Sequence, residues 1–198
     1  KRIFQAKELT DSDFEKIGKA VELLEKSNFF IDDTSALSPS EILSRSRKLK
    51  REFPELGLVV LDYLQLMRAD NSNPSRVNEM SEISRATKAL AKELDVPVIA
   101  LSQLNRASET RTNKEPIMAD LRDSGALEQD ADLVIFPFRP EFHEPTPENK
   151  GIAKVIVAKH RNGETGNILL HWAARYTSFE DLALNDPAYD NFSSNNQN

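Results

Sequence analysis

The chain has 198 residues, of which 39% are hydrophobic and 29% are charged, so it is long enough and apolar enough to bury the core of one ordinary globular domain. It contains no cysteine and only three histidines, which excludes a disulfide scaffold, a thiolate metal site and a cysteine nucleophile, and argues against a histidine-rich metal site. The formal net charge of -6 gives no overall attraction to nucleic acid or to an anionic membrane, so binding to either would require a local patch.

The sequence shows no targeting or membrane segment. Lys1 and Arg2 open it without a following apolar region, so we expect no signal peptide, a cytoplasmic location and a chain that is internal to a longer protein. The apolar runs are far shorter than the roughly 20 residues that span a bilayer, so no membrane contact is expected. We expect residues 1–181 to form one partial domain and residues 182–198 to form a flexible tail.

Two amphipathic helices with clear start signals are expected near the beginning of the chain. Thr10 followed by Asp13 predicts an N-cap for a helix over 11–26. Residues 38–41 (Ser-Pro-Ser-Glu) combine an N-cap, a proline at the first helical position and a capping box, and they predict the start of a second helix. Between the helices, residues 29–31 (Phe-Phe-Ile) predict a short buried strand.

The middle of the chain alternates strands with a helix. Residues 58–61 (Leu-Val-Val-Leu) form an apolar run of the type that is buried on both faces of a parallel sheet, and residues 97–101 form a second such run. Between them, Asn73-Pro74 is expected to open a helix, whereas the polar residues 105–119 are expected to form a mobile loop. The helix is expected to point four apolar side chains inward: Met80, Ile83, Leu90 and Leu94.

Hairpins are expected toward the C-terminus. Residues 133–136 and 152–157 predict strands, which are joined by a proline-rich segment. The glycine turn at 162–166 leads into a last strand that begins at Ile168. Helices alternating with buried strands, followed by hairpins, predict an α/β fold with a mostly parallel sheet that is flanked by helices and ends in hairpin strands.

Two polar residues follow the predicted buried strands, where open α/β sheets bind ligands. Asp62 comes directly after the first strand, as in a Walker B strand, where a carboxylate can hold Mg²⁺ opposite the phosphates of a nucleotide. Gln103 follows the next strand, where an amide can contact a γ-phosphate or orient a water molecule. The alternative interpretation is that Asp62 caps a turn and Gln103 caps a loop.

Two basic residues end the strand that begins at residue 152. Because alternate residues of a strand point the same way, Lys159 and Arg161 are expected to project together, with His160 pointing elsewhere. Two cations at one strand end repel each other, which favours an anionic ligand between them. An arginine that reaches a transferring phosphoryl group accelerates the reaction by about 10³ to 10⁵. The alternative is a solvated basic hairpin.

Residues 120–132 form a further candidate site. Arg122 lies near Ser124 and Gly125 in an expected loop, and such a loop can bind phosphate through the side chain and backbone N–H groups. The alternative is an acidic turn. None of the six glycines belongs to a G-x-x-x-x-G-K-[ST] phosphate loop, so we expect this chain alone not to hydrolyse ATP.

Taken together in chain order, these segments resemble the C-terminal, RecA-like motor domain of DnaB-type replicative helicases. The resemblance implies a RecA-like P-loop NTPase core whose N-terminal part, including the Walker A loop and the catalytic glutamate, is missing from this sequence. The matching stretches, which cover nearly all of the chain from about residue 10 to 181, are 30–34, 61–67, 101–106, 120–132, 150–153 and 159–166.

The resemblance implies an ATP-dependent, Mg²⁺-requiring helicase that works as a homo-hexameric ring with nucleotide between neighbouring subunits. Asp62 would be the Walker B ligand of magnesium, and Gln103 would sense the γ-phosphate. Lys159 and Arg161 would reach the nucleotide of the next subunit as a lysine and an arginine finger. Such head-to-tail contacts are heterologous and close into a ring.

The resemblance also implies that Arg122, Asp123 and Gly125 line the central channel and bind the backbone of single-stranded DNA. Primase and a helicase loader are expected partners, through parts that this sequence does not contain. Asp123 departs from the family's glutamate, and His160 from its glutamine. A RecA-type recombinase or repair ATPase, and a non-catalytic DNA-binding or assembly fragment, remain alternative functions.

Overall fold

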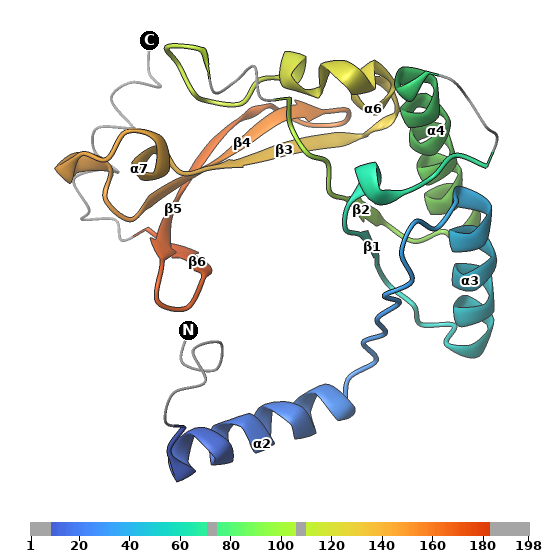
Figure 1. Ribbon diagram of the computed structural model, residues 1–198, viewed down its shortest axis with the longest axis horizontal. Coiled ribbons are helices and arrows are strands. Elements are labelled where there is room, and N and C mark those ends of the chain that lie inside the picture. Colours follow the sequence, from blue (N-terminus) through green and yellow to red (C-terminus); the bar gives the residue numbers. More distant parts are fainter. Residues whose placement is uncertain (1–8, 71–74, 106–109, 183–198) are drawn as a thin grey trace.

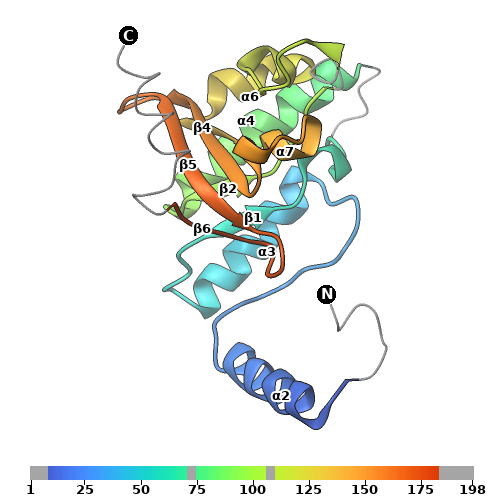
Figure 2. The same ribbon diagram turned by 90° about the vertical axis from the view of Figure 1, so that its left-hand side faces the viewer.

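The computed structural model of the chain is described here for residues 9–70, 75–105 and 110–182, without the side chains of residues 122–124. The strands form two sheets: β1 (Val59–Leu61) and β2 (Val98–Ala100) are parallel, whereas β3 (Leu133–Phe138), β4 (Ile152–His160), β5 (Gly166–Ala173) and β6 (Ser178–Asp181) follow one another as an antiparallel meander (Figure 1). Figures 1 and 2 both show helix α2 (Asp11–Glu25) set apart from the two sheets, at the end of the segment that leads to α3 (Pro39–Glu52).

The capping residues predicted for the first two helices are confirmed. At the start of α2, Asp13 N–H donates to the Thr10 hydroxyl (3.3 Å) and Thr10 N–H donates to the Asp13 carboxylate (3.1 Å). At the start of α3, Ser38 and Glu41 make the same reciprocal pair, with Ser38 N–H donating to the Glu41 carboxylate at 2.8 Å. Each box satisfies backbone donors that the first helical turn leaves without an internal partner.

The buried strand predicted at residues 29–31 is wrong. These residues form no strand and are exposed, with Ile31 at 79%. A strand requires a partner for its backbone groups, and this segment is instead tied to α3 by side chains. Arg45 of α3 donates to the Asp32 carboxylate (2.6 Å) and to the Thr34 hydroxyl (2.9 Å).

The parallel sheet is covered by helices on one face. Helix α4 (Arg76–Leu94) packs its buried apolar side chains against it, and α3 adds Ile42 and Leu43. The four inward-pointing residues predicted for α4 are all buried, which confirms them: Met80, Ile83, Leu90 and Leu94.

The expectation that β1 and β2 are buried on both faces is wrong. Val60 in β1 is 54% exposed and Ile99 in β2 is 52% exposed, because both point away from α3 and α4. The predicted mostly parallel sheet is also corrected, since among the described residues one of the four strand pairings is parallel and three are antiparallel. The short connections after β4 and β5 permit only antiparallel neighbours, and within the described ranges no ladder joins β2 to β3.

The antiparallel sheet is backed by helices that precede it in the chain. The 3-10 helix η2 (Met118–Ser124) and helix α6 (Gly125–Asp130) lead into β3, which buries Val134 and Phe136 and exposes Leu133 and Ile135. The proline-rich segment contains helix α7 (Pro140–His143) and the 3-10 helix η3 (Pro147–Asn149). The hairpin predicted around 162–166 is confirmed, whereas β6 has no counterpart in the predicted elements.

Some predicted features lie outside the described residues: the helix start at Asn73-Pro74, part of the 105–119 loop, and all but the first residue of the 182–198 tail. Within the part of the chain that the structure describes, no helix is long and apolar enough to traverse a bilayer.

Candidate functional site

Asp62 and Gln103 lie at the same edge of the parallel sheet. Leu61 pairs with Ala100 in the β1–β2 register, so Asp62 follows one strand and Gln103 follows the other at their carboxyl ends. The pairing continues beyond the strands, since Leu64 N–H donates to the Leu101 carbonyl oxygen (3.0 Å). Asp62 and Gln103 are both exposed, as expected of residues that face a ligand at the end of an open sheet.

Gln65 joins the two strand ends. It belongs to the 3-10 helix η1 (Leu64–Leu66), and its Nε2 donates to Ser102 Oγ (2.9 Å) and to the Gln103 carbonyl oxygen (3.3 Å). Its Oε1 accepts from the Gln103 N–H (3.1 Å). Gln65 was not among the residues predicted from the sequence, although a polar side chain between Leu64 and Leu66 at a strand end is a signal of the same kind as Asp62.

Asp62 is suited to a magnesium ion that arrives with phosphates. The carboxylate is exposed and makes no ion pair with any residue that the structure describes. No group of three or more histidine or acidic side chains that could hold a metal is found in the described ranges. Mg²⁺ needs only one or two protein carboxylates when water and phosphate oxygens complete its shell. A single Asp62 therefore fits a nucleotide-borne magnesium, and a metal centre built by protein alone does not.

Lys159 and Arg161 are held at the end of β4 by their own chain. Lys159 Nζ donates to the carbonyl oxygens of Glu128 (2.6 Å) and Gln129 (3.2 Å) in α6. Arg161 pairs with Asp132 through Nη1 and Oδ1 (3.0 Å), and its N–H donates to the Asp132 carbonyl oxygen (2.8 Å). Among the described residues no hydrogen bond or ion pair joins either cation to Asp62 or Gln103.

Asp132 is the anion that pairs with Arg161. The ammonium of Lys88 on α4 also pairs with its carboxylate. That hydrogen bond is the main reason why the pKa of Asp132 lies below its ordinary value of 3.8, and the charges of Arg161 and Lys159 lower it further. The Arg161 side chain remains 50% exposed, so its guanidinium keeps donors for another acceptor.

The segment that carries Arg122, Asp123 and Gly125 is helical, which corrects the expectation of a loop. Arg122 and Asp123 lie in η2, and Gly125 begins α6. The reason is local: the Asp120 carboxylate accepts the Ile117 N–H (2.9 Å) at the start of η2. Gly125 is exposed, so its backbone is accessible to a ligand.

Asp120 is the most enclosed charge in this region. Only 3% of it is exposed, and Arg111 donates to both of its carboxylate oxygens, at 2.9 and 2.8 Å. The Asp120 carbonyl oxygen also accepts the N–H of Asn105, at 3.0 Å. The chain that follows Gln103 is therefore connected to the start of η2.

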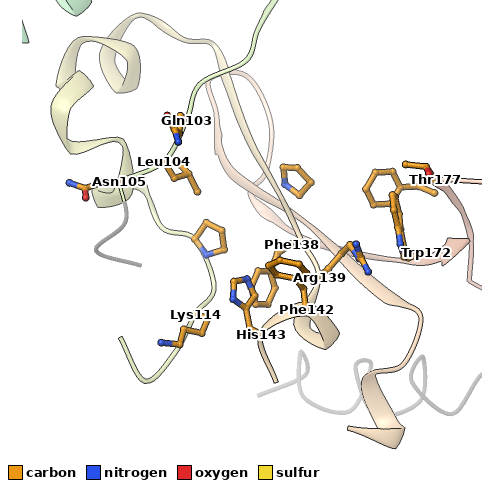
Figure 3. A pocket seen from close by; sticks show the side chains of 13 residues that line it. Gln103, Leu104, Asn105, Lys114, Phe138, Arg139, Phe142, His143, Trp172 and Thr177 are labelled. Atoms are coloured by element: carbon orange, nitrogen blue, oxygen red, sulfur yellow. The ribbon is translucent and has the colours of Figure 1, made fainter. Parts of the chain in front are cut away.

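An aromatic pocket of about 810 Å³ lies between the Gln103 segment and the antiparallel sheet (Figure 3). The Arg139 guanidinium lies 4.5 Å from the centroid of the Trp172 ring, and Trp172 packs edge-on against Phe179 at 5.0 Å. The Arg139 Nε is buried and has no hydrogen-bond partner in the described part of the chain. A guanidinium and an indole present flat faces, so the pair suits a planar aromatic ligand.

Neither Arg139 nor Trp172 was predicted from the sequence. The available signal was that Arg139 directly follows the β3 strand, just as Asp62 follows β1. Its partner lies far along the chain in β5, and only the pairing of β3 with β4 and of β4 with β5 brings them together.

Comparisons with known proteins place these features in a family context. A family model described as the DnaB-like helicase C terminal domain matches residues 1–181. The replicative DNA helicase DnaB of Pasteurella multocida (strain Pm70) is 49% identical over 176 residues, which cover 88% of this chain and 38% of that protein. DnaB of Haemophilus influenzae is 45% identical over 183 residues, covering 92% and 39%. The chain thus spans less than half the length of these curated relatives.

Two solved structures superimpose closely on this chain. A solved ATPase domain superimposes with a TM-score of 0.87 at 41% identity, covering 92% of this chain and 65% of that chain. A DnaB-like replicative helicase, studied together with its interactions with primase, superimposes with a TM-score of 0.86 at 41% identity, covering 92% and 44%.

Proposed function

The chain belongs to the DnaB-like helicase C-terminal domain family, and from that premise we propose that it is part of a replicative DNA helicase motor that couples ATP hydrolysis to movement along single-stranded DNA. The observation that carries the proposal is the shared strand edge, where Asp62 and Gln103 converge and Gln65 joins them. The likeness of the chain to a solved ATPase domain supports a RecA-like core of which this chain is a part. We expect such a motor to act on replicating DNA in the cytoplasm.

At this edge, Asp62 would hold Mg²⁺ and Gln103 would contact the γ-phosphate. Bound ATP with Mg²⁺ supplies the phosphoryl group whose transfer to water releases the energy for movement. The Asp62 carboxylate would be one of the ligands that hold the metal, and the Gln103 amide would contact the γ-phosphate and so respond to whether it is present. The sequence has no phosphate loop of its own, so the complete site requires residues that this chain does not contain.

The Arg139–Trp172 pair would hold the base of the nucleotide. The same pocket is lined by Gln103 on one side and by Arg139 and Trp172 on the other, so one ligand can reach both. A purine is planar and polarisable, and it can stack on a guanidinium or an indole face.

Lys159 and Arg161 would complete the site of a neighbouring subunit in a hexameric ring. Both are preorganised at the end of β4 by contacts with α6 and Asp132. The exposed guanidinium of Arg161 can then reach a phosphate of the next protomer, where it would stabilise the charge of the transition state.

Arg122, Asp123 and Gly125 would face single-stranded DNA. Side-chain and backbone donors at this position suit phosphate oxygens and not particular bases, so DNA binding should tolerate any sequence. Primase and a loader are expected to bind through parts outside this chain; one of the structures that it resembles comes from a helicase studied with primase.

The test is Arg161→Ala in the complete protein that carries this chain. We expect ATP hydrolysis to fall by about 10³-fold or more while nucleotide binding changes little, because the arginine acts mainly in the transition state. Strand displacement on a forked duplex should be lost as well. His160→Ala is the matched control, since His160 is adjacent, exposed and expected to leave turnover unchanged.

Unchanged turnover in Arg161→Ala would remove Arg161 from the mechanism. If the unaltered protein paired strands and did not displace them, a recombinase would be favoured. DNA binding without any hydrolysis would favour a binding module.

A further inference from the structure

Gln65 holds both backbone groups of Gln103 with one side-chain amide. Gln65 Oε1 accepts from the Gln103 N–H (3.1 Å), and Nε2 donates to the Gln103 carbonyl oxygen (3.3 Å). Two bonds to the same residue fix the position and the direction of its backbone more firmly than one bond can. The direction of the exposed Gln103 side chain is thereby restricted as well.

The Gln65 amide has a third contact, with the hydroxyl of Ser102 (2.9 Å). The amide thus contacts two consecutive residues beyond β2, where the ladder between β1 and β2 has ended. Beyond the end of the ladder, the side-chain amide of Gln65 therefore supplies hydrogen bonds that connect the two chain segments.

Gln65 is itself firmly anchored. Its neighbour Leu64 is buried in a cluster with Met80 and Ile83 of α4. The Gln65 carbonyl oxygen accepts from Arg76 Nη2 (2.8 Å), and Arg76 is in turn paired with Glu79 at 2.9 Å. The side chain therefore extends from a backbone that α4 holds in place.

Gln65 also lies only three residues after Asp62. A displacement of the Asp62 segment is therefore transmitted to the Gln103 backbone through one short, hydrogen-bonded bridge. An amide contact that is misplaced by about 1 Å can cost on the order of 10²-fold in rate.

We propose that Gln65 is a positioning residue that couples the magnesium-binding strand end at Asp62 to the γ-phosphate-contacting residue Gln103. This inference rests on the proposed function, because it assigns Gln65 a role in ATP hydrolysis. Gln65 does not itself contact the nucleotide; it acts through Gln103.

The experiment compares single and double variants of the complete protein. Gln65→Ala should lower kcat for ATP hydrolysis by about 10- to 100-fold with KM changed less than about 3-fold, because the geometry of the reacting complex is lost and substrate binding is kept. Gln65→Glu should lie between Gln65→Ala and the unaltered protein, since it keeps the acceptor for the Gln103 N–H and loses the donor. Asn28→Ala, at an exposed amide side chain between α2 and α3, is the matched control.

The double variant Gln65→Ala/Gln103→Ala is the decisive comparison. If Gln65 acts through Gln103, removing Gln65 should cost no further activity once Gln103 is alanine. Amide hydrogen exchange adds a readout that does not depend on activity: peptides containing Gln103 should exchange faster in Gln65→Ala than in Asn28→Ala.

Each other outcome overturns a defined claim. Additive losses in the double variant, or full activity of Gln65→Ala despite faster exchange at Gln103, would overturn the positioning role and leave the proposed function intact. Absence of hydrolysis in the unaltered protein would overturn the proposed function and the role of Gln65 with it.

Discussion

Single charged residues set the geometry of the β4 end. Asp132 accepts from Lys88 and Arg161 while its own side chain remains half exposed, so it orders both cations and leaves the Arg161 side chain half exposed as well. Exposed pairs of this kind contribute at most about 1 kcal/mol to stability. Their value here is therefore orientation: the pair with Asp132 holds the Arg161 guanidinium at the end of β4.

The pKa of Asp132 gives a direct test of this arrangement. Because the pKa is depressed in the folded chain, the associated stabilisation is present above the ordinary value of 3.8 and is lost as the pH falls through the lower folded value. Lys88→Gln should raise the pKa of Asp132 toward 3.8 by more than Arg161→Gln does, because the hydrogen bond from Lys88 is the largest cause. Carboxyl ¹³C NMR titration measures both shifts; the reverse order would contradict this arrangement.

A second prediction at this scale concerns Arg139. Arg139→Ala should weaken ADP binding by about 10- to 30-fold, the amount expected for losing a desolvated stacking contact of about 1.4–2 kcal/mol. Arg139→Lys should recover little, because an ammonium has no flat face. Arg175→Ala is the control, since Arg175 also lies over an aromatic ring, Tyr176, but in an exposed turn. Equal losses in both alanine variants would remove Arg139 from the nucleotide site.

At the scale of elements, the Asp120–Arg111 pair connects three segments. The Asp120 carboxylate accepts the Ile117 N–H at the start of η2 and also binds Arg111. The Asp120 carbonyl oxygen accepts the N–H of Asn105. The proposed DNA-contacting residues of η2 are therefore linked to the chain that follows Gln103 through a nearly buried ion pair.

Breaking the Asp120–Arg111 ion pair should lower the free energy of unfolding. Asp120→Asn leaves the Arg111 guanidinium without its anion, and we expect the free energy of unfolding to fall by about 3 kcal/mol, at the low end for buried pairs because Arg111 is partly exposed. Urea unfolding of the chain followed by circular dichroism measures the change. Glu79→Gln, which breaks the exposed pair with Arg76, should cost less than about 1 kcal/mol. Similar losses in both variants would contradict the structural role of Asp120.

Local signals predicted helices better than sheets. The capping boxes at Thr10 and Ser38 and the inward residues of α4 depend on neighbours within one or two turns, and all are confirmed. Residues 29–31 are as apolar as a strand but have no strand to pair with, which a linear pattern does not reveal. The antiparallel β3–β6 meander likewise depends on pairings, and β6 carries too few apolar residues to be recognised.

Part of the candidate site could likewise be predicted from local signals. Asp62 and Gln103 follow apolar runs, so the strand-end rule identified them, and the structure brings them to one edge. The rule identified Lys159 and Arg161 as well, but it did not reveal that α6 and Asp132 hold them. Contacts between distant segments, such as Gln65 with Gln103, are not encoded in any local spacing.

At the scale of the whole molecule, charge bears on how DNA would be bound. A chain of net charge -6 repels DNA on average, so the proposed contact must be confined to a short segment around Arg122. For single strands, the logarithm of affinity falls with the logarithm of salt concentration by about 0.7 per neutralised phosphate.

In the complete protein, substituting Arg122 should therefore reduce the magnitude of the slope of log affinity against log salt concentration by about 0.7. Fluorescence anisotropy with a labelled oligonucleotide at several salt concentrations measures the slope. Arg51→Ala, at an exposed position of α3, is the control and should leave the slope unchanged. Equal slopes for the Arg122 variant and the unaltered protein would mean that Arg122 faces away from DNA.

Trp172, the chain's single tryptophan, lies in the aromatic pocket beneath Arg139. All indole emission from this sequence therefore originates at one known place. A ring that stacks beside it should quench or shift that emission, so occupancy of the pocket can be followed optically, in real time and without a dye.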